Sequence, residues 1–194
     1  MKYAYLLLFF LCLGTSVRAA ELRGFLLTKD GYQLTGYLER IQYSPTGNEI
    51  RFVNDFGDTY IIHPFLVSGF GFTHEGTSYR FVSRFHEGQW FFLQEKADGR
   101  TLRLYRLPES SDSWVDDSLL RLFTVQPPTF YLEYGRGQLM GVPRTGFRRA
   151  MREFFNVVSP AMAKKVGTKG YRYRDLALIV AEVNEMSARQ RRRL

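Results

Sequence analysis

Along most of this chain, hydrophobic and polar residues alternate one by one, which is the period of a β-strand with one buried face. In Glu49–Val53, for example, Ile50 and Phe52 fall on one side and charged residues on the other. Similar short stretches succeed one another from Leu22 to Tyr134, separated by turn-forming residues. Strands linked by such short turns are most simply arranged as an antiparallel meander, barrel-like or a sandwich.

The turns between these strands carry specific signals. Lys29-Asp30-Gly31 and Ala97-Asp98-Gly99 place Asp-Gly between apolar stretches, where glycine accepts the positive φ of a tight hairpin. Asn54–Asp58 is a third turn, and it leads into the long apolar stretch Thr59–Phe72. In Trp90–Leu93 both faces are apolar, which predicts a central strand that is covered on both sides.

After Gly135 the period changes to that of an α-helix. Hydrophobic residues recur three or four positions apart, as on one side of a helix: Phe147, Ala150, Met151, Phe154, Phe155 and Val158. Ser159-Pro160 is typical of a helix start and Gly167 of a helix end, which predicts a short helix over Ala161–Val166. A third apolar stripe lies in Asp175–Met186. The sequence therefore predicts an α+β fold, with an antiparallel β meander followed by two to three C-terminal helices.

The N-terminus has the three parts of a secretory signal peptide. Lys2 supplies the basic start, Tyr3–Leu13 is apolar, and Val17-Arg18-Ala19 fits a signal-peptidase site. We expect cleavage after Ala19 and a mature protein in the periplasm, at the periphery of the outer membrane or outside the cell. The only cysteine, Cys12, would leave with the signal, so the mature chain would have no disulfide and no thiol nucleophile. No other segment is long and apolar enough to span a bilayer as a helix.

These patterns divide the chain into four parts. Residues 1–19 form the signal peptide, 20–134 an antiparallel β domain, 135–188 a basic helical segment packed on or beside it, and 189–194 a disordered basic tail. Residues 21–134 contain 11 Lys+Arg against 15 Asp+Glu, whereas residues 135–194 contain 14 against 4. A nearly neutral sheet is thus joined to a strongly basic helical segment, which suggests an anionic partner.

The candidate binding site in the basic segment consists of five arginines: Arg136, Arg144, Arg148, Arg149 and Arg152. Arg144, Arg148 and Arg152 are four positions apart, so they line one ridge if the helix begins near Pro143. Like charges at this spacing repel by about 0.2–0.5 kcal/mol per pair. This favours an anionic lipid, lipopolysaccharide or acidic glycan as a partner, and the alternative is an ordinary solvated helix face. We expect no nucleic-acid partner for an exported protein.

Other residues could carry chemistry, but their patterns do not favour it. His63, His74 and His86 lie at separate strand ends and turns, so a zinc site would require distant hairpins to meet. Asp55 and Asp58 have the spacing of a tight turn, where aspartate accepts hydrogen bonds from nearby backbone N–H groups. The chain has neither a Gly-x-Ser-x-Gly nor a His-Glu-x-x-His motif. We therefore predict no catalytic residue, no metal site and no cofactor.

A glycine-rich stretch, Gly135–Gly141, lies between the last predicted strand and the first predicted helix. That is the position of a phosphate-binding loop, but its third glycine comes one residue too late for Gly-x-Gly-x-x-Gly. A dinucleotide site also requires a parallel βαβ unit, and the predicted sheet is antiparallel. We interpret these glycines as a turn between a strand and a helix.

A further set of motifs consists of turns and helix faces: Gly24–Gly31 with Leu34-Thr35-Gly36, Asn54–Asp58, Gly69–Phe72, Phe154-Phe155, Lys164-Lys165, Tyr173–Asp175, Ile179-Val180 and Val183-Asn184. Together they cover most of the mature chain, and they resemble a family of secreted proteins that is common in Bacteroidota and whose activity is uncharacterised. The resemblance implies an exported protein with a β-rich body and a helical C-terminal tail, and it implies no particular activity.

These observations favour a non-catalytic protein of the cell envelope. We expect it to act as a binding or interaction module for an anionic envelope component or for another envelope protein. The alternative is an envelope hydrolase whose site, which no motif marks, lies at one end of the β domain.

Overall fold

The computed structural model describes residues 22–123, 125–135 and 137–192 of the 194-residue chain. Within these residues eleven strands form one sheet: β1 (Leu22–Leu27), β2 (Gln33–Ser44), β3 (Gly47–Asn54), β4 (Thr59–Ile62), β5 (Gly69–His74), β6 (Thr77–His86), β7 (Gln89–Ala97), β8 (Leu102–Arg106), β9 (Val115–Asp116), β10 (Phe130–Tyr134) and β11 (Gln138–Val142). Three α-helices come after them: α2 (Phe147–Val158), α3 (Pro160–Lys165) and α4 (Leu176–Arg191). Short 3-10 turns are η1 (Pro64–Leu66), η2 (Leu120–Leu122) and η3 (Tyr173–Asp175). The predicted α+β fold is confirmed.

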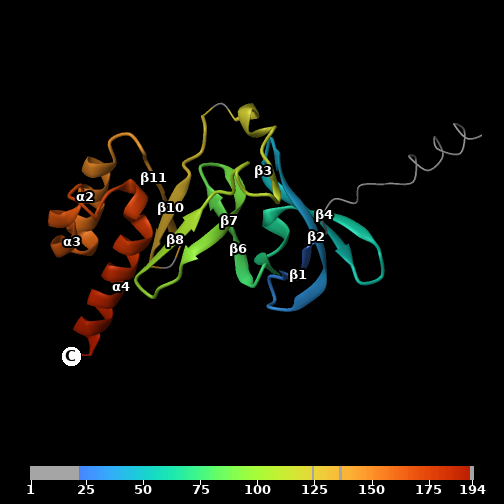
Figure 1. Cartoon of the computed structure of the whole chain (residues 1–194), viewed down its shortest axis with the longest axis horizontal. Helices are drawn as coiled ribbons and strands as arrows, with labels where there is room; N and C mark the ends of the chain where they lie inside the picture. Colours follow the sequence, from blue (N-terminus) through green and yellow to red (C-terminus); the bar gives the residue numbers. More distant parts are fainter. Residues whose placement is uncertain (1–21, 124, 136, 193–194) are drawn as a thin grey trace, which may run out of the picture.

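Six of the strands close into a partial ring. Hairpin neighbours pair antiparallel along most of the sheet, and β1 pairs with β5 as well as with β2. The ring β1-β2-β3-β7-β6-β5 is closed by a short parallel bridge between Gly47 of β3 and Trp90 of β7. In Figure 1 this ring occupies the right and centre of the molecule, and the helices lie at the left.

The ring closes through one buried amide. Asn48 of β3 is 1% exposed, and its side-chain amide both donates a hydrogen bond to the backbone of Phe92 on β7 and accepts one from it. Its Nδ2 donates to the Phe92 carbonyl at 3.1 Å, and its Oδ1 accepts from the Phe92 N–H at 2.7 Å. At the preceding position only glycine fits, because a Cβ on Gly47 would lie 1.8 Å from the Trp90 carbonyl oxygen and its φ is +138°. The strands therefore approach each other too closely for any side chain at this point.

Aromatic side chains fill the ring. Phe70 stacks on Phe81 at 4.5 Å between ring centroids and meets Phe92 edge-on at 4.9 Å. Each of these three rings is at most 1% exposed. The prediction that Trp90–Leu93 is a central strand is confirmed for Phe91, Phe92 and Leu93, which are buried. Burial of large aromatic areas gives this chain a core without disulfides.

The strands β8, β10 and β11 extend the sheet beyond the ring and have two different faces. Leu104 and Leu132 point toward the helices and join their core, whereas Tyr105 and Tyr131 point the other way and join the core of the ring. Strand alternation thus places this part of the sheet between the ring and the helices, as Figure 1 shows.

The helices cover the outer face of β8, β10 and β11. On α2, Phe147, Met151 and Phe155 of the predicted stripe are buried, and Ala150, Phe154 and Val158 are half-buried. α4 is held to the start of β8 by Asn184, whose Oδ1 accepts from the Leu102 N–H at 2.9 Å and whose Nδ2 donates to the Leu102 carbonyl at 2.9 Å. No helix within the described ranges is long and apolar enough to cross a bilayer.

Three details of the C-terminal part differ from expectation. The glycines after Tyr134 do not lead directly into a helix, because Gly135 and Gly137 form the turn of a hairpin and β11 pairs with β10 up to Val142. The sheet thus continues beyond residue 134, into the range that the sequence predicts to be helical. The sequence also predicts a disordered tail from residue 189, but α4 continues through Arg191, and residues 193–194 lie outside the described residues.

We predict that Asn48→Ala destabilises the fold by about 2–4 kcal/mol, because it leaves the buried N–H and C=O of Phe92 without partners. Urea denaturation followed by tryptophan fluorescence measures this loss. The exposed Asn156 on α2 provides the control, and Asn156→Ala should change the free energy of unfolding by less than about 0.5 kcal/mol. Equal stability of the two variants would show that the amide does not close the ring.

Candidate functional site

Four arginines lie on α2 or just before it, and we call them together the α2 arginine surface: Arg144, Arg148, Arg149 and Arg152. The last three line one groove, and Arg144 is not among its lining residues. On α2, Arg149 lies opposite the buried stripe, whereas Arg148 and Arg152 lie beside that stripe. Arg144 does not share the helical ridge, because Gly146 caps α2 with φ +74° and the helix begins only at Phe147. Arg136, the fifth predicted residue, lies outside the described residues.

The Arg148 side chain is held against the loop after α3. A Cβ added to Gly167 would lie 2.8 Å from both Cγ and Cδ of Arg148 and 3.1 Å from its Nε. Gly167 ends the short helix region with φ +90°, a conformation that glycine adopts without strain. The glycine predicted as a helix stop therefore also makes room for the stem of Arg148.

Arg152 is more deeply placed than its neighbours. Solvent does not reach its Nε, and this Nε has no hydrogen-bond partner among the described residues. Arg152 lines an open groove of about 440 Å³ together with Gly146, Arg148, Arg149, Glu153 and Asn156. The lining residues lie between Gly146, which caps α2, and Asn156, and three arginines are among them.

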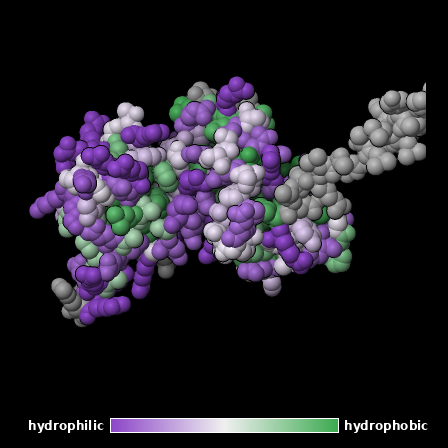
Figure 2. All heavy atoms as spheres, in the orientation of Figure 1, coloured by the Kyte–Doolittle hydropathy of each residue, from purple (hydrophilic) through white to green (hydrophobic). Residues whose placement is uncertain are grey.

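Acidic residues neutralise little of this charge. Within the described chain, no carboxylate lies within 4.0 Å of the charged nitrogens of Arg144, Arg148 or Arg152, and the contact of Arg149 with Glu153 is long, at 3.9 Å, and exposed. Several arginines of the sheet are differently placed: Arg84 and Arg103 contact Glu133, and Arg106 contacts Asp112. In Figure 2 hydrophilic residues dominate the helical lobe at the left.

A second polar cluster lies between β6 and the β8–β10 pair. Tyr105 Oη donates to Glu133 Oε2 at 2.5 Å, and Arg84 donates to the same oxygen through Nε at 3.2 Å and Nη2 at 3.0 Å. Burial by itself would raise the pKa of Glu133. The hydrogen bonds from Tyr105 and Arg84, with the charges of Arg84 and Arg103, outweigh it and lower that pKa. The carboxylate is thus kept ionised, which suits an ion pair that ties strands together better than a proton donor at neutral pH.

Motifs and spacing in the sequence do not reveal this cluster. Its one signal is Glu133 itself, an acid within the otherwise apolar Phe130–Tyr134. Alternation alone could have marked this carboxylate as a residue that requires a buried cationic partner. Which arginine supplies that charge depends on how far the sheet curls, because Arg84 lies 49 positions earlier in the chain.

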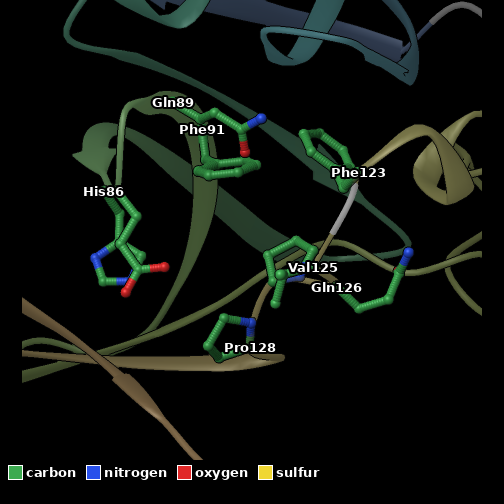
Figure 3. Close-up of a pocket in the computed structure, with 9 residues that line it drawn as sticks. His86, Gln89, Phe91, Phe123, Val125, Gln126 and Pro128 are labelled. Carbon is green, nitrogen blue, oxygen red and sulfur yellow. The ribbon is translucent and has the colours of Figure 1, made fainter.

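His86 lies in a pocket at one end of β6 and β7. This pocket, of about 400 Å³, is lined by His86, Glu87, Gln89, Phe91, Phe123, Val125, Gln126, Pro127 and Pro128. Figure 3 shows His86 on one side, Phe91 and Phe123 on another, and Val125, Gln126 and Pro128 opposite. His86 Nε2 lies 3.6 Å from Glu87 Oε1, and its ring meets that of Tyr131 edge-on at 5.1 Å.

The three histidines do not form a metal site. His63 lies 3.2 Å from Glu49, His74 lies 3.9 Å from Glu75, and His86 belongs to the pocket just described. In the part of the chain that the structure covers, no three His, Cys, Asp or Glu side chains are arranged to hold a metal ion. Asp55 accepts a hydrogen bond from the Thr35 side chain on β2 at 2.6 Å, and Asp58 accepts one from the Asn54 side chain at 3.1 Å. The backbone N–H groups of this turn donate to Asn54 Oδ1 instead of to the predicted aspartates.

Comparison with known proteins gives no match among protein-family models, curated proteins or solved structures. The resemblance to secreted proteins of Bacteroidota therefore stays a prediction. Two features of the molecule bear on its function, namely the α2 arginine surface and the pocket at His86.

We predict that Glu133→Gln costs about 2 kcal/mol at pH 7, because it removes hydrogen bonds to a charged acceptor. Since folding lowers the pKa of Glu133, its stabilising effect is complete above the pKa of an unfolded glutamate, about 4.3, and is lost as the pH falls through the lower folded-state value. Urea denaturation from pH 7 to pH 3 should therefore show wild type and variant converging. Glu153→Gln, at an exposed site, is the control. A difference that is independent of pH would contradict the ion pair.

Proposed function

We propose that this chain is an exported, non-catalytic binding protein of the cell envelope that holds an anionic partner on its α2 arginine surface. The main support is the state of these arginines. Among the described residues three of the four have no carboxylate within 4.0 Å, whereas arginines of the sheet such as Arg84 and Arg106 are in ion pairs. Unpaired and closely spaced arginines attract an anion from outside the chain.

The position of the arginines on the helix gives further support. Arg148 and Arg149 lie in the first turn of α2, which has no acidic residue. The backbone N–H groups of a first turn carry partial positive charge, so cations there are unfavourable and anions are favourable. Arg148 and Arg152 also repel each other at four positions' separation. A bound anion would relieve both kinds of repulsion, which gives the interaction a physical driving force.

The partner is proposed from the compartment. A protein that carries an export signal meets lipid phosphates, lipopolysaccharide and acidic glycans, all of which present dense negative charge. The sheet would then serve as a rigid body that fixes the helical layer through Asn184 and the leucines of β8 and β10. An acidic surface of another envelope protein is the remaining partner class.

We predict that the triple variant Arg144→Gln, Arg148→Gln, Arg152→Gln binds anionic vesicles about 100-fold more weakly than wild type at low salt, since each arginine near an anionic surface contributes about 1 kcal/mol. Glutamine keeps most of each side chain and removes its charge. Vesicle co-sedimentation measures binding.

The matched control removes the same net charge elsewhere, with Arg40→Gln, Arg100→Gln and Arg121→Gln at exposed positions of the β part. If both triple variants weaken binding equally, net charge alone explains it and the α2 arginine surface is not the site. If wild type does not bind anionic vesicles, lipopolysaccharide or acidic glycan, the proposal fails.

The pocket at His86 supports a second candidate, an envelope hydrolase. It lies at one end of the β part and brings an imidazole and the Glu87 carboxylate to the same wall. In such an enzyme His86 would act as general base toward a water molecule, a role that contributes about 100-fold or more to the rate.

A screen of p-nitrophenyl esters and glycosides separates the two candidates, with His86→Asn as the variant and His74→Asn as the matched control. Turnover by wild type that falls about 100-fold only in His86→Asn would favour the hydrolase. Turnover that is absent in wild type, or equal in both variants, rules out His86 as the base and leaves the binding protein.

A further inference from the structure

The cations on the exposed side of α2 are all arginines. The lysines of the helical layer, Lys164, Lys165 and Lys169, belong to α3 and the loop after it. A lysine supplies a point charge, whereas arginine presents a planar fork of N–H donors that matches two oxygens of one anion. The presence of arginine at each of these positions therefore suits a ligand that presents several oxygens in a fixed geometry.

Two of these arginines have particular surroundings. The stem of Arg148 occupies the space that a Cβ on Gly167 would need, and the Nε of Arg152 is shielded from solvent without a partner in the described chain. Both side chains line the same groove. At i and i+4 on a helix their Cβ atoms are about 6 Å apart, so both forks can reach one small anion between them.

We propose that the anion held at this surface is a phosphate monoester, gripped by the forks of Arg148 and Arg152. This rests on the proposed function and narrows its ligand. A phosphate monoester has three terminal oxygens and up to two negative charges, so it can accept paired N–H bonds from two guanidinium groups at once. A carboxylate has two oxygens and satisfies one fork. Phosphate-bearing ligands are therefore favoured over uronic acids and over acidic protein side chains.

The structure also indicates what each arginine contributes. Solvent does not reach the Nε–H of Arg152, so a phosphate contacts this donor only after the side chain turns toward the groove. The Nε–H then gains its first partner, so it should discriminate most strongly between ligands. The stem of Arg148 passes close to Gly167, and Arg148 lines the same groove as Arg152. Arg149 also lines this groove, whereas Arg144 precedes the helix and would add attraction over distance.

The test keeps the charge and changes the shape, with Arg148→Lys and Arg152→Lys combined in one variant. The probes are phosphatidylcholine vesicles that contain phosphatidic acid, whose headgroup is a phosphate monoester, and vesicles of equal surface charge that contain a fatty acid carboxylate. We expect wild type to prefer the phosphate vesicles by about tenfold or more and the double lysine variant to bind both kinds alike. Arg40→Lys with Arg100→Lys, at exposed positions of the β part, is the matched control and should keep the preference.

A second variant tests the position of Arg148 without replacing any arginine. Gly167→Ala places a Cβ where the stem of Arg148 lies and strains the backbone at φ +90°, so it should weaken phosphate binding while carboxylate binding persists. Circular dichroism confirms that each variant is folded. Calorimetry with soluble glycerol 3-phosphate separates the two sources of the group: binding of the free ester indicates recognition of phosphate alone, and binding to vesicles only indicates a lipid headgroup.

These experiments distinguish failure of the phosphate clamp from failure of the proposed anion-binding function. A double lysine variant that keeps the phosphate preference, or a wild type that binds both vesicle types equally, overturns the phosphate clamp and leaves an unspecific anion surface. A wild type that binds neither vesicle nor glycerol phosphate, yet captures an acidic envelope protein, also overturns the clamp and leaves only the protein partner class. A wild type that binds no anion at all removes both proposals.

Discussion

The fold depends on the pair of hydrogen bonds between the Asn48 side chain and the backbone of Phe92. Antiparallel hairpins bring most neighbouring strands together, but β3 and β7 are far apart in the sequence and meet in parallel at one point only, between Gly47 and Trp90. A single backbone bridge contributes little stabilisation. The side-chain amide of Asn48 forms the hydrogen bonds that a paired backbone residue would form, and so it holds the two strands in register. This closure gives the aromatic rings of the ring core an enclosed space to fill.

Strand β7 connects the closed ring to the part of the sheet that carries the helices. β7 pairs with β6, β8 and β3, so it belongs both to the ring and to the outer sheet of β8, β10 and β11. The outer sheet buries tyrosines against the ring and leucines against α2 and α4, and Glu133 with Arg84 fixes its angle to β6. Once Phe147, Met151 and Phe155 are buried on this sheet, the opposite side of α2 faces solvent, as the exposed Arg149 and Asn156 show. The arginines on that side are therefore displayed by the packing of the core.

Much of this could be predicted from local patterns. A period of two indicated the strands and the two faces of β8, and a period near four indicated the buried stripe of α2. Contacts between distant segments could not be predicted. Gly47 and Asn48 come after a proline-threonine turn and read as part of it, because their partner lies on β7. The start of α2 at Phe147, which removes Arg144 from the ridge, depends on where the β10–β11 hairpin ends, and the pairing of Glu133 with Arg84 depends on the curl of the sheet.

The decisive measurement is nuclear magnetic resonance of the arginine Nε–Hε groups during titration with glycerol 3-phosphate. Each guanidinium gives its own signal, so the measurement locates the ligand as well as detecting it. We expect the largest shift at Nε of Arg152, followed by Arg148, while Arg84 and Arg103 in the sheet do not change. Shifts that are uniform over all exposed arginines, or confined to the sheet, would contradict a phosphate clamp on α2.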